Sequence, residues 1–137
     1  MATFNKFETF VGDVGKKVHD LDADMLMVYL TNNLPDTAAD SVKADLVGIT
    51  EENGYTAADI TNTWSETTGT GTLGGTDVEW TATTGGFGPF QYVVLYNDTP
   101  TAPADPLVAW WDYGSSISCG DGEKFTVDFG TSILTLA

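Results

Sequence analysis

The first hydrophobic pattern in the chain is helical. Apolar side chains recur three or four residues apart, at Phe4, Phe7, Val11, Val14 and Val18. This spacing places them on one stripe and predicts a helix from about residue 4 to residue 18, within an N-terminal helical segment 1–20. Gly12 and Gly15 each cost about 1 kcal/mol relative to alanine inside a helix, so the helix needs a packing partner. That partner is either a sheet of the same chain or the surface of another protein chain.

The second pattern is a strand that is apolar on both sides. Its side chains are Leu26, Val28 and Leu30 on one face and Met25, Met27 and Tyr29 on the other. A strand covered on both faces belongs in the middle of a sheet. Asp20, Asp22 and Asp24 precede it with the spacing of a calcium loop, but the glycine and glutamate of such a loop are missing, so we interpret them as a turn.

Residues 33–55 mix turn signals with one or two turns of helix, and Asn53-Gly54 predicts a tight turn. Short strands then follow at 60–66, 77–83, 124–129 and 132–137, and the glycine- and threonine-rich residues 67–76 are interpreted as a flexible connection. The inward side chains are predicted to be Val78, Trp80, Ala82, Phe125, Val127 and Phe129. This order predicts a mainly β fold, an antiparallel β-sandwich or jelly-roll-like domain with an N-terminal α-helix.

Two aromatic runs, PFQYVVLYND at 89–98 and LVAWWDYG at 107–114, are the least polar part of the chain. Strand alternation assigns Phe90, Tyr92, Val94 and Tyr96 to one face and Val93 and Leu95 to the other. In the second run it groups Trp111 with Leu107, Ala109 and Tyr113, and Trp110 with Val108 and Asp112. We therefore expect the two tryptophans to point in opposite directions. One aromatic row would pack the core, and the other would be covered by the helix or by a neighbouring subunit.

The length of 137 residues suits a single domain spanning 1–137, with residues 21–137 as the β-sandwich body. No apolar run approaches the ~18 residues that span a bilayer, and the N-terminus lacks the pattern of a secretory signal. We expect synthesis in a cytoplasm, where the lone Cys119 would stay reduced.

Charge restricts the partners. Twenty acidic residues face five lysines and no arginine, which gives a net charge of −15. Such a chain repels phosphate backbones and anionic headgroups, so neither nucleic acid nor a membrane is expected as a partner.

Candidate chemistry is sparse. Asp112 beside Trp110 and Trp111 is the best general-acid candidate, since indoles around a carboxylate raise its pKa. A turn or hydrogen-bonding role is the commoner one for such an aspartate, and nucleophile, phosphate-loop and zinc motifs are absent from the sequence. We expect a protein that is not an enzyme and has no metal or other cofactor. Exposed tryptophans also stack on sugars, so carbohydrate binding stays open.

Several segments in fixed order carry a family resemblance: MATFNKF, a strand ending LTN, NGYTA, GPFQYVVLYNDT, PLVAWWDYGSS, DGEKFTVDF and ILTL. As a set they resemble small virion structural proteins of tailed bacteriophages, over nearly the whole chain. The resemblance implies a capsid decoration, or cement, protein made in the host bacterial cytoplasm and attached to the capsid exterior. Its implied partners are the major capsid protein and further copies of itself in a homotrimer, because sites where three subunits meet favour a trimer.

The contact surface expected from this hypothesis combines the N-terminal segment with one end of the sandwich. Its candidate interface residues are Phe4, Lys6, Phe7, Val11, Lys16, Lys17, Trp110, Trp111 and Tyr113. The lysines would meet capsid carboxylates. The alternative hypothesis is a phage tail or fibre-associated structural protein that binds host-surface glycans through Trp110 and Trp111.

Overall fold

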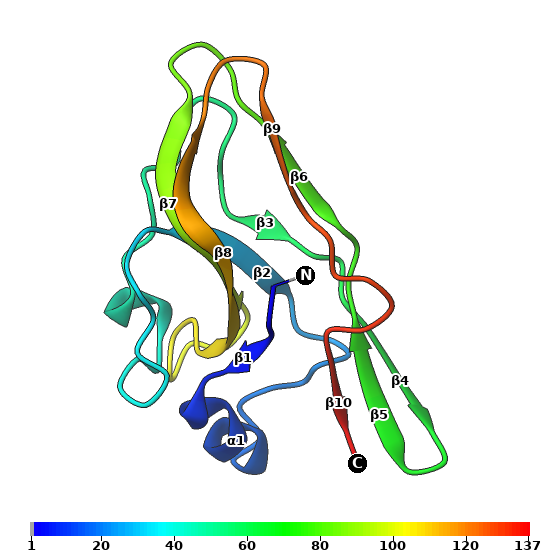
Figure 1. The fold of residues 1–137 in the computed structure, drawn as a ribbon. Helices are drawn as coiled ribbons and strands as arrows, with labels where there is room; N and C mark the ends of the chain where they lie inside the picture. Colours follow the sequence, from blue (N-terminus) through cyan, green and yellow to red (C-terminus); the bar gives the residue numbers. More distant parts are fainter. Residues whose placement is uncertain (1) are drawn as a thin grey trace.

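The protein is described by a computed structural model that covers residues 2–137. The fold is mainly β, with antiparallel sheets and an α-helix near the N-terminus, as predicted (Figure 1). The helical elements are α1 (Glu8–Gly15) and the short 3₁₀ helix η1 (Lys43–Asp45). The strands are β1 (Asn5–Lys6), β2 (Leu26–Thr31), β3 (Ala58–Asp59), β4 (Thr63–Thr67), β5 (Thr70–Gly74), β6 (Val78–Thr81), β7 (Phe87–Asn97), β8 (Leu107–Cys119), β9 (Lys124–Val127) and β10 (Leu134–Leu136).

The main sheet has the strand order β1-β8-β7-β2-β3, and all its pairs are antiparallel. The long β7–β8 hairpin contains both aromatic runs, and it curves through the upper part of the molecule in Figure 1, above α1. β2 lies between β7 and β3 and is buried on both sides, which confirms the predicted central strand.

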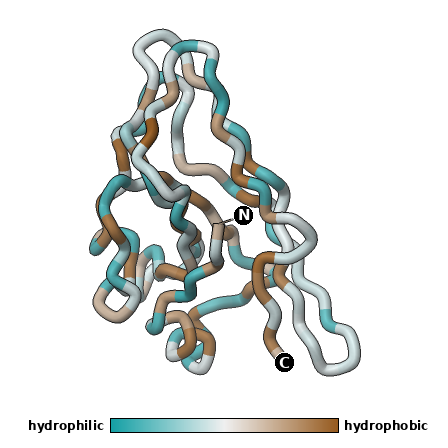
Figure 2. Tube along the Cα trace, in the orientation of Figure 1, coloured by the Kyte–Doolittle hydropathy of each residue, from teal (hydrophilic) through white to brown (hydrophobic). Residues whose placement is uncertain are grey.

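The second layer consists of the β6–β9 pair and the β10-β5-β4 sheet. β4 and β5 form a hairpin that projects from the body in Figure 1 and carries few strongly hydrophobic residues in Figure 2. The prediction of a flexible connection over 67–76 is therefore wrong, since most of this segment is strand. Gly71 permits the hairpin to close, because a Cβ there would lie 2.2 Å from the Trp64 ring.

The main sheet has two buried faces with different covers. We name one the closed face, formed by Tyr29, Val94, Tyr96, Leu107 and Trp110. The opposite side is the groove face, formed by Leu30, Val93, Leu95, Ala109 and Trp111. The second layer packs on the groove face through side chains that include Leu73, Trp80, Phe125, Phe129 and Ile133. The inward positions predicted for β6, β9 and the residues just after them are thus confirmed for Val78, Trp80, Ala82, Phe125 and Phe129, which are all buried. Val127 is half-buried.

The N-terminal helix is shorter than predicted. Residues 5–6 are a strand, and the Phe7 backbone N–H donates to the Val108 carbonyl at 3.1 Å, so pairing with β8 delays the start of α1 to Glu8. The helix then turns Phe10 and Asp13 inward, and leaves Val11 56% exposed. The single stripe from Phe4 to Val18 is therefore wrong, because its first members belong to an extended segment with a different periodicity.

Two irregularities in the β7–β8 ladder change the predicted alternation. The register of β7 against β8 shifts between Phe90 and Tyr92. Phe90 therefore lies with Val93 and Leu95 on the groove face, whereas the predicted alternation placed it with Tyr92 on the opposite face. A second shift lies between Leu95 and Tyr96, and it leaves Val108 of β8 without a paired residue in β7. Consequently Leu107 lies with Trp110 on the closed face, and Val108 lies with the groove-face cluster, which reverses the predicted grouping.

Candidate functional site

A surface groove lies between β8 and the segment that runs from β9 to β10. Its volume is about 500 Å³. It is lined by Ala2, Phe4, Val93, Trp111, Tyr113, Phe125, Thr126, Val127, Asp128, Phe129, Ser132 and Ile133. Aromatic and aliphatic side chains dominate this lining, and most of the rest is small or neutral. The groove is therefore suited to bind an apolar group.

An irregularity in β8 aims Tyr113 at the groove. The pairs Phe90–Ile117 and Tyr92–Asp112 leave residues 113–116 of β8 opposite Gln91 alone, so this part of the strand bulges outward. The bulge is fixed by Asp112, whose Oδ1 accepts hydrogen bonds from the Gly114 backbone at 2.7 Å and the Gln91 amide at 3.0 Å. Gly114 has a φ of 105°, a conformation that suits glycine.

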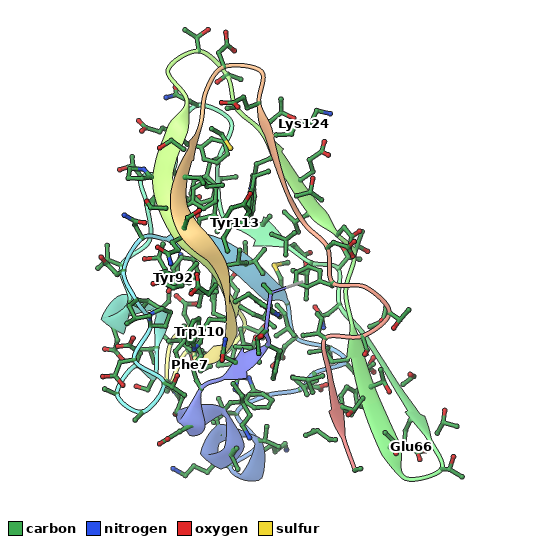
Figure 3. The ribbon with its side chains drawn as sticks, viewed as in Figure 1. Phe7, Glu66, Tyr92, Trp110, Tyr113 and Lys124 are labelled. Carbon is green, nitrogen blue, oxygen red and sulfur yellow. The ribbon has the colours of Figure 1, made fainter. Side chains whose placement is uncertain are left out.

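As a result Tyr113 is 54% exposed, with its ring 5.7 Å from that of Phe125 in β9. Figure 3 shows Tyr113 on the β9 side of β8, whereas Phe7 and Tyr92 lie toward the other side. These hydrogen bonds give Asp112 a structural role in the turn, so no catalytic role is assigned to it.

The remaining walls come from the two ends of the chain. Phe4 and Phe129 each contact Trp111 with ring centres 5.8 Å apart. Phe129 is held by a hydrogen bond from its backbone N–H to the Asp77 carboxylate at 2.9 Å. Ring planes meet at 68° for Phe4–Trp111, 63° for Trp111–Phe129 and 56° for Tyr113–Phe125. The walls are therefore corrugated, and they suit a side chain inserted between rings better than a flat sugar face.

The charge in the groove is of one sign, negative. Asp128 is exposed and is the charged member of the described lining. One of its oxygens accepts a hydrogen bond from the Gly130 backbone at 2.8 Å. Lys124, the only cation after residue 43, forms an ion pair with Glu79 at 3.2 Å, and no other ion pair occurs within residues 2–137. The groove thus presents a carboxylate with no nearby lysine in its lining to neutralise it.

The closed face is covered by the protein itself. The Trp110 indole N–H donates to the Thr37 hydroxyl at 3.3 Å, and the Tyr29 hydroxyl donates to the Leu46 carbonyl at 2.7 Å. Lys43 adds its ammonium over the ring of Tyr29, 5.3 Å from the ring centre. The expectation that the helix or a neighbouring subunit covers this row is therefore wrong, because segment 32–57 and Phe7 cover it.

The predicted interface residues separate into distinct groups. Phe4, Trp111 and Tyr113 meet in the groove. Phe7 and Trp110 pack in the closed-face cluster instead, and Phe7 is completely buried, so it is not available to a partner. The exposed remainder, Val11, Lys6, Lys16 and Lys17, lies on β1, α1 and the residues that follow α1.

Sequence reasoning missed the second wall of the groove. Phe125, Phe129 and Asp128 were assigned to an ordinary amphipathic strand, with no sign that it would stand apart from β8. The signal that could have found them is the Tyr-Gly-Ser-Ser sequence at 113–116, where a glycine and two serines interrupt an apolar strand and indicate a bulge.

His19, the chain's one histidine, lies in a cluster of polar side chains next to Phe10 of α1. The Asn97 amide lies 3.0 Å from His19 Nδ1 and donates to the Asp24 carboxylate at 2.7 Å, while His19 Nε2 is buried without a hydrogen-bond partner. Burial lowers the pKa of His19, and the nearby Asp13 and Asp24 carboxylates oppose that shift. The predicted turn at Asp20 is confirmed, since its carboxylate accepts the backbone N–H groups of Asp22 and Ala23.

Other chemistry is limited in residues 2–137. The structure there gathers no three His, Cys, Asp or Glu side chains into a group that could hold a metal ion. Burial raises the pKa of the Cys119 thiol, and the Glu123 carboxylate adds to this effect, so the thiol is poorly reactive. No helix in the described part of the chain is long and apolar enough to cross a bilayer.

Comparisons with protein-family models, with curated proteins and with solved structures each find no match to this chain.

Proposed function

We propose that this protein is a decoration, or cement, protein that binds the outer surface of a tailed-bacteriophage capsid as a homotrimer. The observation that carries the proposal is the aromatic groove between β8 and β9, an apolar surface on an otherwise strongly acidic chain. A concave surface lined mainly by aromatic and aliphatic side chains is typical of a binding site. The resemblance in sequence to small virion structural proteins supplies the biological setting.

The groove supports a role in binding. Its described lining contains no histidine, cysteine or lysine that could activate Ser132 as a nucleophile, and Asp128 has no second carboxylate beside it in the lining. A cement protein needs no catalysis, because each bridge between neighbouring capsid subunits adds binding free energy that is repeated over the shell. The net charge of −15 agrees with a position outside the shell, away from packaged DNA.

Quantitative gel analysis of purified virions tests the proposal. On the order of hundreds of copies per virion are expected, and purified protein should saturate shells that lack it. The sedimentation of the free protein should correspond to three chains. A copy number of about a dozen or fewer, with no binding to shells, would contradict a cement role.

The second candidate is a tail or fibre-associated structural protein that binds host-surface glycans. The exposed ring of Tyr113 beside the half-buried Trp111 favours it, since aromatic rings also stack on sugars. Under this alternative, soluble glycans from the host surface would quench tryptophan fluorescence, and the copy number would be low.

Truncation is a poor way to locate the contact surface. Removing residues 1–18 would delete β1 and the buried Phe7 along with the exposed lysines, so loss of binding could reflect loss of the fold. Point substitutions at Lys6, Lys16 and Lys17, which are all exposed, test the predicted lysine contacts without this complication.

A further inference from the structure

We infer that the groove receives a single apolar side chain from a partner protein segment that carries a lysine or arginine next to it. This inference rests on the proposed function and names the chemistry of the contact. The sequence-based hypothesis pairs lysines of this chain with carboxylates of the capsid. In the contact inferred for the groove, this chain supplies the carboxylate and the partner supplies the cation.

The shape of the groove determines the apolar part of the ligand. A volume of about 500 Å³ has room for one large side chain together with the backbone that carries it. Phe4, Phe129 and Tyr113 surround Trp111 and the adjacent Phe125 at steep angles, so a ligand meets ring edges and ring faces together. Leucine, methionine or an aromatic side chain fits such walls.

Charge determines the polar part. Asp128 is exposed and is the charged residue of the described lining. The nearest lysine in the β9 segment, Lys124, is already paired with Glu79. A partner with a carboxylate beside its apolar anchor would be repelled, whereas a lysine or arginine there would donate a charge-assisted hydrogen bond to the second carboxylate oxygen of Asp128.

The same charge argues against two other occupants. If a second copy bound through its own groove, the Asp128 carboxylates of the two copies would be brought together, which is unfavourable whatever other surface forms the trimer. A neutral glycan would form no ion pair with Asp128, and the steep angles between the rings leave it no flat surface wider than the Tyr113 ring.

Selection from a display library of short random peptides, with the full-length chain as bait, tests the inference. The expected consensus is a large apolar residue with lysine or arginine within one or two positions. Synthetic peptides of that consensus should lose at least about tenfold in affinity for Tyr113→Ala and for Asp128→Lys. Ser132→Trp, which fills the groove without removing a contact residue, should also abolish binding.

Matched controls separate the groove from general effects of charge and hydrophobicity. Asp121→Lys makes the same charge change in the exposed turn before β9, and Leu34→Ala removes an exposed apolar side chain elsewhere. Both should bind within about twofold of the wild type. Overturning results are enrichment of acidic peptides, no enrichment, or equal losses in the controls and the groove variants.

Two more measurements assign the occupant. Concentration-dependent self-association that Tyr113→Ala abolishes would show that a second copy occupies the groove. Quenching of tryptophan fluorescence by a soluble N-acetylglucosamine tetramer would show that a glycan occupies it. Either result overturns the inference. Shell binding distinguishes it from the proposed function. If Tyr113→Ala and Asp128→Lys proteins still saturate shells with wild-type affinity, the groove assignment fails while the decoration role stands.

Discussion

Trp110 and Trp111 are neighbours in the chain, yet one lies in a region that the chain itself covers and the other lies in a region that stays open as a groove. Trp110 lies beneath segment 32–57, with its indole N–H bonded to Thr37 and its ring 5.8 Å from Tyr92. Trp111 lies in a groove between two sheets, where the rings of Phe4 and Phe129 contact it without closing the space. The difference teaches that a row of aromatic residues does not by itself identify an interface, because the chain's own loops decide which row is covered.

The largest change in the free energy of unfolding is expected when Phe7 on the closed face is compared with Phe4 at the groove. Phe7→Ala should lower the free energy of unfolding by about 3–5 kcal/mol, because its completely buried ring leaves a cavity in the closed face. Phe4→Ala should cost much less, since Phe4 is half-buried at the groove. Urea denaturation measures both, and equal losses would show that the groove is as closed as the other face.

A smaller effect is expected for the indole hydrogen bond. Trp110→Phe should cost about 1 kcal/mol because the Thr37 hydroxyl loses its donor while most of the ring packing remains. Trp111→Phe is the matched control, since the Trp111 indole makes no hydrogen bond within residues 2–137. If the two substitutions cost the same, the hydrogen bond contributes little to closing the face.

The part of the pH dependence of unfolding that comes from His19 should be smaller still, because it reflects the titration of one side chain. Burial lowers the pKa of His19 in the folded chain, so between pH 6.5 and the folded value the unfolded chain binds more protons. The free energy of unfolding attributable to His19 is therefore fully present above pH 6.5 and falls as the pH is lowered. Urea denaturation of His19→Gln and wild-type protein from pH 5 to pH 8 isolates this contribution, and parallel curves would contradict it.

The smallest effect on stability is expected for the residue with the most exposed groove ring. Tyr113→Ala should change the free energy of unfolding by no more than about 0.5 kcal/mol, because more than half of the side chain is already in solvent. Thermal denaturation checks this value. A loss as large as that of Trp110→Phe would mean that Tyr113 supports the fold, which would weaken its use as a binding probe.

Much of the fold could be predicted from periodicity alone. The two-sided apolar pattern of residues 25–30 correctly indicates an interior strand, and the alternation of Phe125 and Phe129 correctly indicates their burial. These succeed because burial on a pleated strand repeats every second residue. The register shift at Leu95 was not predictable, since one extra residue in a ladder depends on the partner strand and no glycine or serine marks it in the local sequence. The shift at Phe90 is the one that Tyr-Gly-Ser-Ser at 113–116 indicates.

The candidate site was only partly predictable. Trp111 and Tyr113 were selected for their aromatic character, and Phe4 for a helical stripe that the structure does not contain. An N-terminal helix is present as predicted, but its predicted start at residue 4 is wrong because residues 5–7 pair with β8 as an extended segment, a tertiary interaction that overrides local periodicity. Asp128 and Phe129 could not be placed near Trp111 without the three-dimensional arrangement of β8 and β9.

The pairing of β1 with β8 also has a consequence for folding. Asn5 lies opposite Trp110, 105 positions further along the sequence, so this pairing closes a long loop. Phe7, which is completely buried and donates its backbone N–H to Val108, reaches its place only once that loop has closed. The entropy of loop closure must be offset before this contact stabilises the fold, so the addition of β1 to the main sheet is expected to be a slow step.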